Sequence, residues 1–468
     1  MTEKEEVLIG LEIHLELDTK TKLFCSCARS GSAEPNSRTC IVCLGMPGSK
    51  PVVNKKAVDY AIKLALATKS KIAPELIFSR KSYFYPDMSK NYQITQYELP
   101  LASGGYIKLD SGKKVNLIRI HMEEDPAAMV HPAGMQKSSY VLVDYNRSGD
   151  PLVEVVTEPD MKSSAEAREF MNKLITILSY LEIFNINNCI IKADVNVNIK
   201  PYPRVEIKNV TGFKEIQKAI EYELERQRQE LKEGRKGKQH TRAWDGESSF
   251  ELRSKETEAE YGYIVDPDLT PIELTKDMLS KIESEMPELA DEKLEKFTKE
   301  HGITDEMASI LSKDKELAGV FEKAAAKVNA DLASKWVRRE LTRVLNYNKK
   351  KFSEVKMNEE HLIDLLKLVE SKKISDRTAQ KILEILVVEP FDVNDYVKKE
   401  GLEMVSDSGA IEKMCKEAIE ENPKAAEEFK EGNQNSLNYL VGQVMRKSKG
   451  KANPQEVNDI IKKLVKSL

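Results

Sequence analysis

The chain has 468 residues, of which 40% are hydrophobic and 32% are charged, and its net charge is −4. This length exceeds one ordinary domain, so we expect two or three domains, each with its own apolar core. The nearly balanced charge excludes a uniformly cationic coat, and any surface that binds nucleic acid must therefore be local.

The first six residues lack the basic and apolar regions of a signal peptide, and no apolar run approaches the roughly 20 residues of a membrane span. We therefore expect a cytoplasmic protein with no membrane partner. In that compartment its six cysteines stay reduced.

A change in composition near residue 292 predicts a domain boundary. Up to about Leu274 the sequence alternates between short strand patterns and turns, whereas beyond it helical patterns follow one another. We predict an α+β domain over residues 1–292, with a mainly antiparallel sheet covered by helices. An all-α helical domain over 293–405 and a small α-helical tail domain over 406–468 should follow it.

Three helices of the first domain carry clear start signals or spacing. Asn54 is placed to cap a segment with apolar residues at helical intervals, and Ser163 with Glu166 forms a capping-box pattern. A third helix is predicted from about Phe213 to Leu231. These helices should cover one face of the sheet.

Residues 11–17 alternate strictly between apolar and polar, which predicts a strand. Its polar face presents Glu12, His14 and Glu16. Taken alone, the pattern is equally typical of a half-exposed strand with no function.

The same pattern recurs on two further strands. Residues 190–200 place Asp194 on a polar face, and after a turn residues 204–208 return with Glu206 and Lys208, which predicts a β-hairpin. A strand over residues 115–122 delivers three acids at its end. Alternation favours Glu123 over Glu124 as the neighbour of His121, but the strand end leaves residues 123, 124 and 125 open.

Acids and an imidazole beside lysine and arginine suit a site for Mg²⁺ and phosphate, because the acids hold the cation and the bases hold the phosphate. Routine salt bridges on separate exposed strands are the alternative.

Residues 79–96 gather three positive charges and three tyrosines, with Gln96 at the end of the stretch. Arg80, Lys81 and Tyr83 could serve nucleotide phosphates or stack on a base. A tyrosine-rich surface loop is the other interpretation. The chain has neither a GxxxxGK[ST] nor a GxGxxG motif, so any ATP site must be of another kind.

Two close cysteine pairs form the strongest spacing signal. Cys25 and Cys27 are followed after twelve residues by Cys40 and Cys43. Four thiolates can close a tetrahedral site without an open position, which predicts a structural zinc ion. Iron at the same ligands, or four reduced thiols without metal, stays open.

Several motifs then occur in the order found in one enzyme family: Ile9-Gly-Leu-Glu-Ile-His14, Cys40-x-x-Cys-Leu-Gly-x-Pro47, Tyr83-Phe-Tyr-Pro-Asp87, Arg119-Ile-His-Met-Glu-Glu-Asp125 and Glu206-Ile-Lys-Asn209. Together they resemble the B subunits of tRNA-dependent aspartyl/glutamyl-tRNA amidotransferases, and the resemblance covers essentially the whole chain. It implies a cradle domain, a helical domain and a tail that contacts tRNA. The implied activity is phosphorylation by ATP of the side-chain carboxylate of a misacylated tRNA, Asp-tRNA(Asn) or Glu-tRNA(Gln), followed by displacement of the phosphate by ammonia.

The resemblance also implies roles for single residues. The metal- and phosphate-handling acids would be Glu12, His14, Glu124, Asp194 and Glu206, with Mg²⁺ on Glu12, His14 and Glu124. Arg80, Lys81, Tyr83 and Lys208 would face ATP or the acceptor end of tRNA. Residues 126–128 and 210–212 depart from the family pattern and receive no role.

The implied partners are an amidase A subunit, which supplies ammonia, and a small C subunit. Residues 431–468 carry seven Lys/Arg against three Asp/Glu, which suits a tail that binds tRNA. A tRNA-binding scaffold without catalysis, or a zinc-ribbon RNA-binding protein, is the alternative function.

Overall fold

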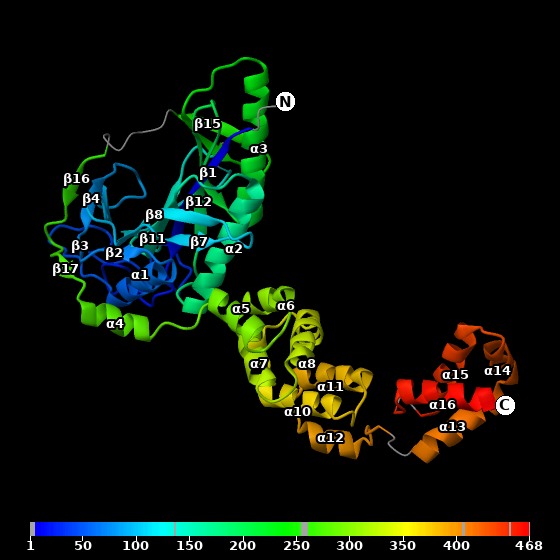
Figure 1. Ribbon diagram of the computed structural model, residues 1–468. Helices are drawn as coiled ribbons and strands as arrows, with labels where there is room; N and C mark the ends of the chain where they lie inside the picture. The colour runs from blue at the N-terminus through cyan, green and yellow to red at the C-terminus, as the bar shows by residue number, and fades with distance from the viewer. Residues whose placement is uncertain (1–4, 135–136, 254–260, 405–407, 449–450, 468) are drawn as a thin grey trace. The chain divides into compact units, whose positions relative to one another are not determined.

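The computed structural model describes residues 5–134, 137–253, 261–404, 408–448 and 451–467 (Figure 1). The chain divides into two compact units, Met1–Leu289 and Ala290–Leu468. The boundary predicted between residues 405 and 406 lies outside the described residues. Within the described ranges, no helix combines the length and the apolar character needed to span a bilayer.

A ten-stranded sheet forms the centre of the first unit, with strand order β15-β14-β13-β12-β1-β11-β8-β6-β2 and with β7 added beside β8. Its pairings are antiparallel except for β13 with β14, which is parallel. The strands are β1 (Val7–Glu16), β2 (Lys71–Ile72), β6 (Ala102–Ser103), β7 (Tyr106–Lys108), β8 (Lys114–Glu124), β11 (Pro151–Thr157), β12 (Ile191–Ile199), β13 (Val205–Thr211), β14 (His240–Trp244) and β15 (Ser249–Arg253). The predicted hairpin is confirmed as β12 and β13.

Three helices pack against one face of this sheet: α1 (Lys55–Ala67), α2 (Ser164–Leu181) and α3 (Phe213–Lys232) (Figure 1). The Asn54 side chain accepts from two backbone N–H groups of α1, and Ser163 accepts from Glu166 N, so both predicted N-caps are confirmed. The Glu166 carboxylate accepts from Lys162 N at 2.7 Å, so the second half of the predicted capping box is made with the residue before the cap. The odd-numbered residues of β1, such as Leu11, share one buried core with these helices. The even-numbered polar residues consequently face the other side.

Smaller elements complete the first unit. A three-stranded sheet has the order β16-β4-β5, and two strand pairs, β9 with β10 and β3 with β17, lie apart from it. Their bounds, with that of helix α4, are β3 (Glu75–Leu76), β4 (Ser79–Ser82), β5 (Tyr92–Thr95), β9 (Ala128–Val130), β10 (Leu142–Asp144), β16 (Tyr263–Val265), β17 (Ile272–Glu273) and α4 (Lys276–Ser284). The first unit with its helix-covered antiparallel sheet confirms the predicted α+β class.

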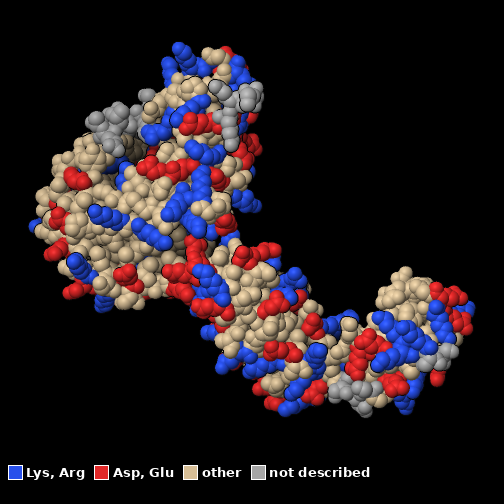
Figure 2. All heavy atoms as spheres, in the orientation of Figure 1, with Lys and Arg blue, Asp and Glu red and all other residues tan. Residues whose placement is uncertain are grey.

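The described part of the second unit is helical and has two separate apolar cores. Around the first core lie α5 (Ala290–Lys299), α6 (Asp305–Ser312), α7 (Lys315–Ala325), α8 (Ala330–Lys335), η2 (Trp336–Leu341), α9 (Thr342–Tyr347), η3 (Phe352–Glu354), α10 (Glu359–Glu370), α11 (Asp376–Val388) and α12 (Val393–Lys399). Around the second lie α13 (Ser408–Glu421), α14 (Pro423–Lys430), α15 (Gln434–Lys447) and α16 (Pro454–Ser467). Lysine and arginine are interspersed with acids over the face shown in Figure 2, in agreement with the small net charge.

Candidate active site and metal centre

The polar face of the large sheet gathers acids from five neighbouring strands. Across the β1–β12 pairing Glu12 lies opposite Asp194, and across the β1–β11 pairing His14 lies opposite Glu154. Paired residues of an antiparallel sheet share a face, so the register alone brings these side chains together. Two groups result, each suited in ligand type and spacing to a metal ion.

The first group consists of Glu12, Asp194 and Glu206, each of which offers a carboxylate oxygen within 4.8 Å of the others. Lys208 Nζ lies 2.7 Å from Asp194 Oδ2 and 3.0 Å from Glu206 Oε1. Burial, followed by the charge of Glu154, raises the pKa of Glu12. Burial acts to lower the pKa of Lys208, but the carboxylates of Asp194 and Glu206 outweigh it and raise this pKa.

Asn196 supports the fit of this group to a cation. Its Nδ2 donates to Glu12 Oε1 at 2.9 Å, and its buried Oδ1 has no hydrogen-bond partner among the described residues. Oxygens from carboxylates and amides are the ligands that Mg²⁺ prefers. The residues present therefore fit Mg²⁺, with Lys208 as the positive charge that balances the acids in its absence.

The second group consists of His14, Glu123 and Glu154, again within 4.8 Å of one another. His14 Nε2 lies 3.7 Å from Glu123 Oε1 and 3.6 Å from Glu154 Oε2, and His121 Nε2 lies 3.3 Å from Glu154 Oε2. Burial acts to raise the pKa of Glu154, but His121, His14 and Arg119 lower it well below its usual range. The Glu154 carboxylate in turn raises the pKa of His121 against the effect of burial.

Strand alternation places Glu123, and not Glu124, in this second group. The Glu124 carboxylate accepts from Ile94 N at 2.9 Å and forms an ion pair with Lys90, and both side chains are nearly buried. Glu124 therefore belongs to the junction between β8 and β5 rather than to either acidic group. The structure thus divides the expected Mg²⁺ set of Glu12, His14 and Glu124: Glu12 lies in the first acidic group, His14 in the second, and Glu124 in neither.

The basic and aromatic residues predicted to face phosphate lie on the three-stranded sheet. Arg80 binds Asp266 through Nε at 2.8 Å and Asp268 through a terminal nitrogen at 2.9 Å, so its charge is balanced within the chain. Lys81 Nζ lies 4.6 Å from the ring centroid of Tyr261. The Tyr83 ring lies 6.2 Å from the ring of Tyr261, centroid to centroid.

This small sheet adjoins the acidic face through β5 and β8. Met122 N donates to Gln96 Oε1 at 2.9 Å, and Gln93 Nε2 donates to the carbonyl of Glu124 at 2.8 Å. Of the residues that the sequence singled out, Glu12, His14, Asp194, Glu206 and Lys208 are thus brought onto one sheet face. Arg80, Lys81 and Tyr83 lie beside it rather than within it.

Glu154 is the functional candidate that the sequence argument missed. It lies in the middle of β11, a strand in which every residue is buried. A single acid within an apolar run was the available signal, since a buried carboxylate needs a charged partner.

The four predicted cysteine ligands come together, with sulfur atoms within 4.8 Å of one another. The sulfurs of Cys40 and Cys43 are 3.9 Å apart, close to the roughly 3.8 Å that a tetrahedral zinc with 2.3 Å bonds requires. A hydrogen bond with Cys25 chiefly lowers the pKa of Cys43 to about 5, while that same contact and burial raise the pKa of Cys25. The cluster is consistent with a structural zinc site.

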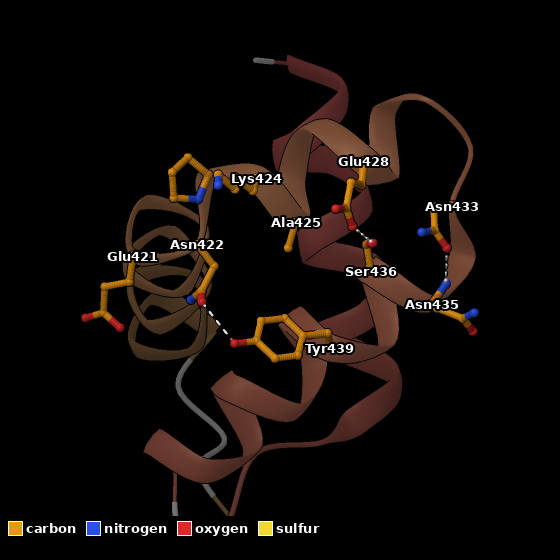
Figure 3. Close-up of a pocket in the computed structure, with 10 residues that line it drawn as sticks. Glu421, Asn422, Lys424, Ala425, Glu428, Asn433, Asn435, Ser436 and Tyr439 are labelled. Carbon is orange, nitrogen blue, oxygen red and sulfur yellow. Dashed lines mark hydrogen bonds between the residues drawn. The ribbon is translucent and has the colours of Figure 1, made fainter.

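A separate pocket of about 640 Å³ opens in the last core region, between α13, α14 and α15 (Figure 3). The Tyr439 hydroxyl donates to Asn422 Oδ1 at 3.3 Å, and Ser436 Oγ donates to Glu428 Oε2 at 2.5 Å. Most of its lining residues are of polar type, but they include none of the potential metal-ligand groups found among the described residues of the first unit.

Comparison with known proteins agrees with the division of the chain into two units. A family model described as the GatB/GatE catalytic domain matches residues 7–280, and one described as the GatB domain matches residues 319–465. The fold and site thus define a two-part chain with an N-terminal catalytic domain.

Curated relatives match along the full length. A protein of Carboxydothermus hydrogenoformans is 40% identical over 98% of both chains, and one of Sulfurisphaera tokodaii is 42% identical over 98% of this chain and 99% of its own. Each bears the name of the B subunit of an aspartyl/glutamyl-tRNA(Asn/Gln) amidotransferase. The chain belongs to this family of amidotransferase B subunits.

Proposed function

We propose that this chain uses ATP and Mg²⁺ to activate the side-chain carboxylate of Asp-tRNA(Asn) or Glu-tRNA(Gln), and then lets ammonia replace the phosphate. A carboxylate oxygen attacks the γ-phosphorus of ATP, the bond to the bridging oxygen breaks, and ADP leaves. The nitrogen of ammonia then attacks the acyl carbon, phosphate departs, and the new amide loses a proton.

The observation that carries the proposal is the pair of acidic groups on one sheet face with Lys208 between two of the acids. Both reactants are anionic, so the reaction needs fixed positive charge and a cation at the transferred phosphoryl group. The all-carboxylate group of Glu12, Asp194 and Glu206 would hold Mg²⁺, because this ion prefers oxygen ligands. Bound there, Mg²⁺ would neutralise phosphate charge.

Other residues would prepare the site. His14, Glu123 and Glu154 would hold a second cation or orient the substrate carboxylate. Lys208 would donate to phosphate once Mg²⁺ balances its acids. Glu124 would act as a positioning residue through its ion pair with Lys90. Lys81 and Tyr83 would contact ATP or the acceptor end from the adjoining sheet.

Ammonia should come from a partner. The two cysteines outside the zinc cluster are buried, and burial raises the pKa of both Cys189 and Cys415 to about 11, so neither is an accessible thiolate. We therefore propose an amidase A subunit as the source of ammonia and a small C subunit as a brace, in a cytoplasmic heterotrimer. The tail helices would contact tRNA through exposed basic residues such as Arg446.

The test is release of γ-phosphate from ATP by the assembled complex in the presence of misacylated tRNA. Glu12→Ala should lower the rate by about a hundredfold or more, because a ligand of the proposed cation is lost. Glu6→Ala, at the exposed approach to the same strand, is the matched control and should leave the rate unchanged. Equal rates for Glu12→Ala and wild type would place the chemistry elsewhere. Binding of tRNA without any phosphate release by wild type would favour the scaffold function.

A further inference from the structure

The segment that begins at the last residue of α9 and leads toward α10, residues 347–356, carries a high density of positive charge. Its lysines at 349, 350, 351 and 356 are all exposed, and none forms an ion pair with a described residue. The one acid of the segment is Glu354. Its carboxylate accepts a hydrogen bond from Lys351 N at 2.8 Å, so it binds the backbone and not a lysine side chain. By contrast, Lys335 in the preceding helix lies 2.6 Å from Asp331.

The segment is held in a defined conformation. Lys349 adopts a left-handed φ of 53°, and its N–H and that of Lys350 bond back to Asn346 O and Leu345 O, both at 3.1 Å. The Glu316 carboxylate accepts from both Ser353 N at 3.0 Å and Ser353 Oγ at 2.7 Å. The lysines are therefore presented on an ordered backbone, and a ligand would not have to order it.

Apolar residues alternate with the charged ones and point inward. Phe352 and Val355 pack against the first helical core, and Met357 is buried within it. The side chains of Lys351 and Lys356 are therefore exposed to solvent. The arrangement follows from the sequence pattern and does not depend on a partner.

Tyr347 adds an aromatic ring to this surface. It is 87% exposed and makes no ring or cation contact with a described residue. A ring so exposed contributes little to the core, yet an exposed ring among lysines is suited to stack on a base, since every base offers a π-face.

A purely structural role explains only part of the charge. Lysines near a helix C-terminus balance its dipole, but the effect is confined to the last turn. The end carbonyls of α9 at Leu345 and Asn346 are already bonded to the backbone of the segment. Lys351 and Lys356 lie beyond that turn.

We infer that residues 347–356 form an RNA-binding surface that holds the phosphate backbone of the same tRNA whose aminoacyl end enters the acidic site. The inference rests on the proposed function for the identity of the RNA. With a net charge of −4 the whole chain does not attract a polyanion, so local unpaired lysines must supply the attraction. In the tail, by contrast, Lys447 is engaged by Glu417 and Glu421.

The chain offers a matched control at the other end of α10. Lys372 also adopts a left-handed φ, of 55°, and Lys372 and Lys373 bond back to Val369 O at 3.0 Å and Leu368 O at 2.9 Å. Both are exposed. They thus repeat the local backbone geometry of Lys349 and Lys350, without the tyrosine and the further lysines.

The experiment measures tRNA affinity of the assembled complex from about 50 to 300 mM salt, with KM and kcat for tRNA-dependent ATP cleavage. Lys349→Gln/Lys350→Gln should lower the salt slope by one to two and raise Kd and KM about tenfold, with kcat unchanged. Tyr347→Ala should weaken binding without changing the slope, and Tyr347→Phe should bind as wild type. Lys372→Gln/Lys373→Gln should stay within twofold of wild type.

An unchanged slope in Lys349→Gln/Lys350→Gln, or an equal loss in the control pair, would overturn the inference. So would a loss of complex assembly in gel filtration, since the surface would then bind protein. These results are separable from failure of the proposed function, in which wild type itself releases no phosphate with misacylated tRNA.

Discussion

Lys208 on β13 reaches the carboxylate of Asp194 on the neighbouring strand, with 2.7 Å between Nζ and Oδ2, while Glu206 accepts from the same ammonium at 3.0 Å. One lysine thus balances two of three acids that converge on a single point of the sheet. A divalent cation at that point would compete with it for the same oxygens. Lys208 is thus a structural counter-charge, and in the proposed mechanism it is also the group that Mg²⁺ would release toward phosphate.

Replacing Lys208 by methionine should make the first unit depend on Mg²⁺. In the absence of Mg²⁺, the variant has no ammonium to balance the charge of three neighbouring carboxylates. We therefore expect its unfolding free energy to fall by about 2 to 4 kcal/mol. Mg²⁺ should restore more stability to the variant than to wild type, as measured by thermal unfolding with and without 10 mM of the ion. Phosphate release should still fall about a hundredfold. Lys200→Met, which removes an exposed lysine that pairs with Glu6, should show none of these effects.

Replacing Cys40 by serine should remove the zinc. The sulfur positions match a closed tetrahedral site, so loss of one thiolate should lower metal content from one ion per chain to well below one. We expect a lower unfolding temperature as well, because metal binding contributes to folding. Inductively coupled plasma analysis of purified protein checks the content. Cys189→Ser, a buried cysteine outside the cluster, should keep the ion, and zinc retained in Cys40→Ser would contradict the site.

Local patterns predicted the strands that carry the site, and their faces. Alternation in β1 and in the β12–β13 hairpin correctly placed Glu12, Asp194 and Glu206 on a common polar side. The cysteine spacing likewise brought four sulfurs together. In each case the information lies within a few residues. Alternation assigns a polar face to β1 and to the hairpin, whereas the β1–β12 pairing that joins the two faces is supplied by the structure.

Partners that depend on long-range register could not be predicted. His14 lies opposite Glu154 only because β1 pairs with β11. The two residues are 140 positions apart in the sequence. Arg80 on β4 binds Asp266, which directly follows β16, a strand that pairs with β4 although it comes almost 200 residues later in the sequence. Alternation did favour Glu123 over Glu124, but the length of β8 was needed to decide which acid faces His14. Nothing in a single sequence fixes such pairings.

Glu154→Gln should leave the imidazole of His121 buried without its counter-charge. His121 Nε2 lies 3.3 Å from Glu154 Oε2, and this carboxylate is what raises the pKa of His121 against burial. In the variant that pKa should drop, which nuclear magnetic resonance titration of the ring can follow. The unfolding free energy should fall by about 3 kcal/mol near pH 6, where the wild-type pair is charged.

Glu158→Gln is the control, since Glu158 is exposed directly after the same strand. It should change neither the titration of His121 nor the unfolding midpoint. An unaltered His121 titration in Glu154→Gln would show that another group holds the imidazole charge.

Asp150 should give the first unit a stability that falls as the pH rises. Its side chain is buried, its Oδ1 has no hydrogen-bond partner among the described residues, and burial raises its pKa to about 8. In the unfolded chain the same carboxyl titrates near pH 4. Between these values the folded state holds a proton that the unfolded state has lost, so unfolding free energy decreases with rising pH. The full contribution is present below about pH 4 and is lost as the pH approaches 8.

Asp150→Asn keeps the neutral form at every pH and should cancel this dependence. Relative to wild type, its unfolding free energy should gain up to about 1.4 kcal/mol per pH unit between pH 5 and pH 8. Urea denaturation in a Trp336→Phe background checks this, because Trp244 is then the remaining tryptophan and lies in the first unit. Asp277→Asn, on the exposed first turn of α4, should not reproduce the pH-dependent gain. A constant difference between Asp150→Asn and wild type from pH 5 to 8 would mean that Asp150 is already ionised in the fold, held by Lys22, whose charge acts to lower this pKa.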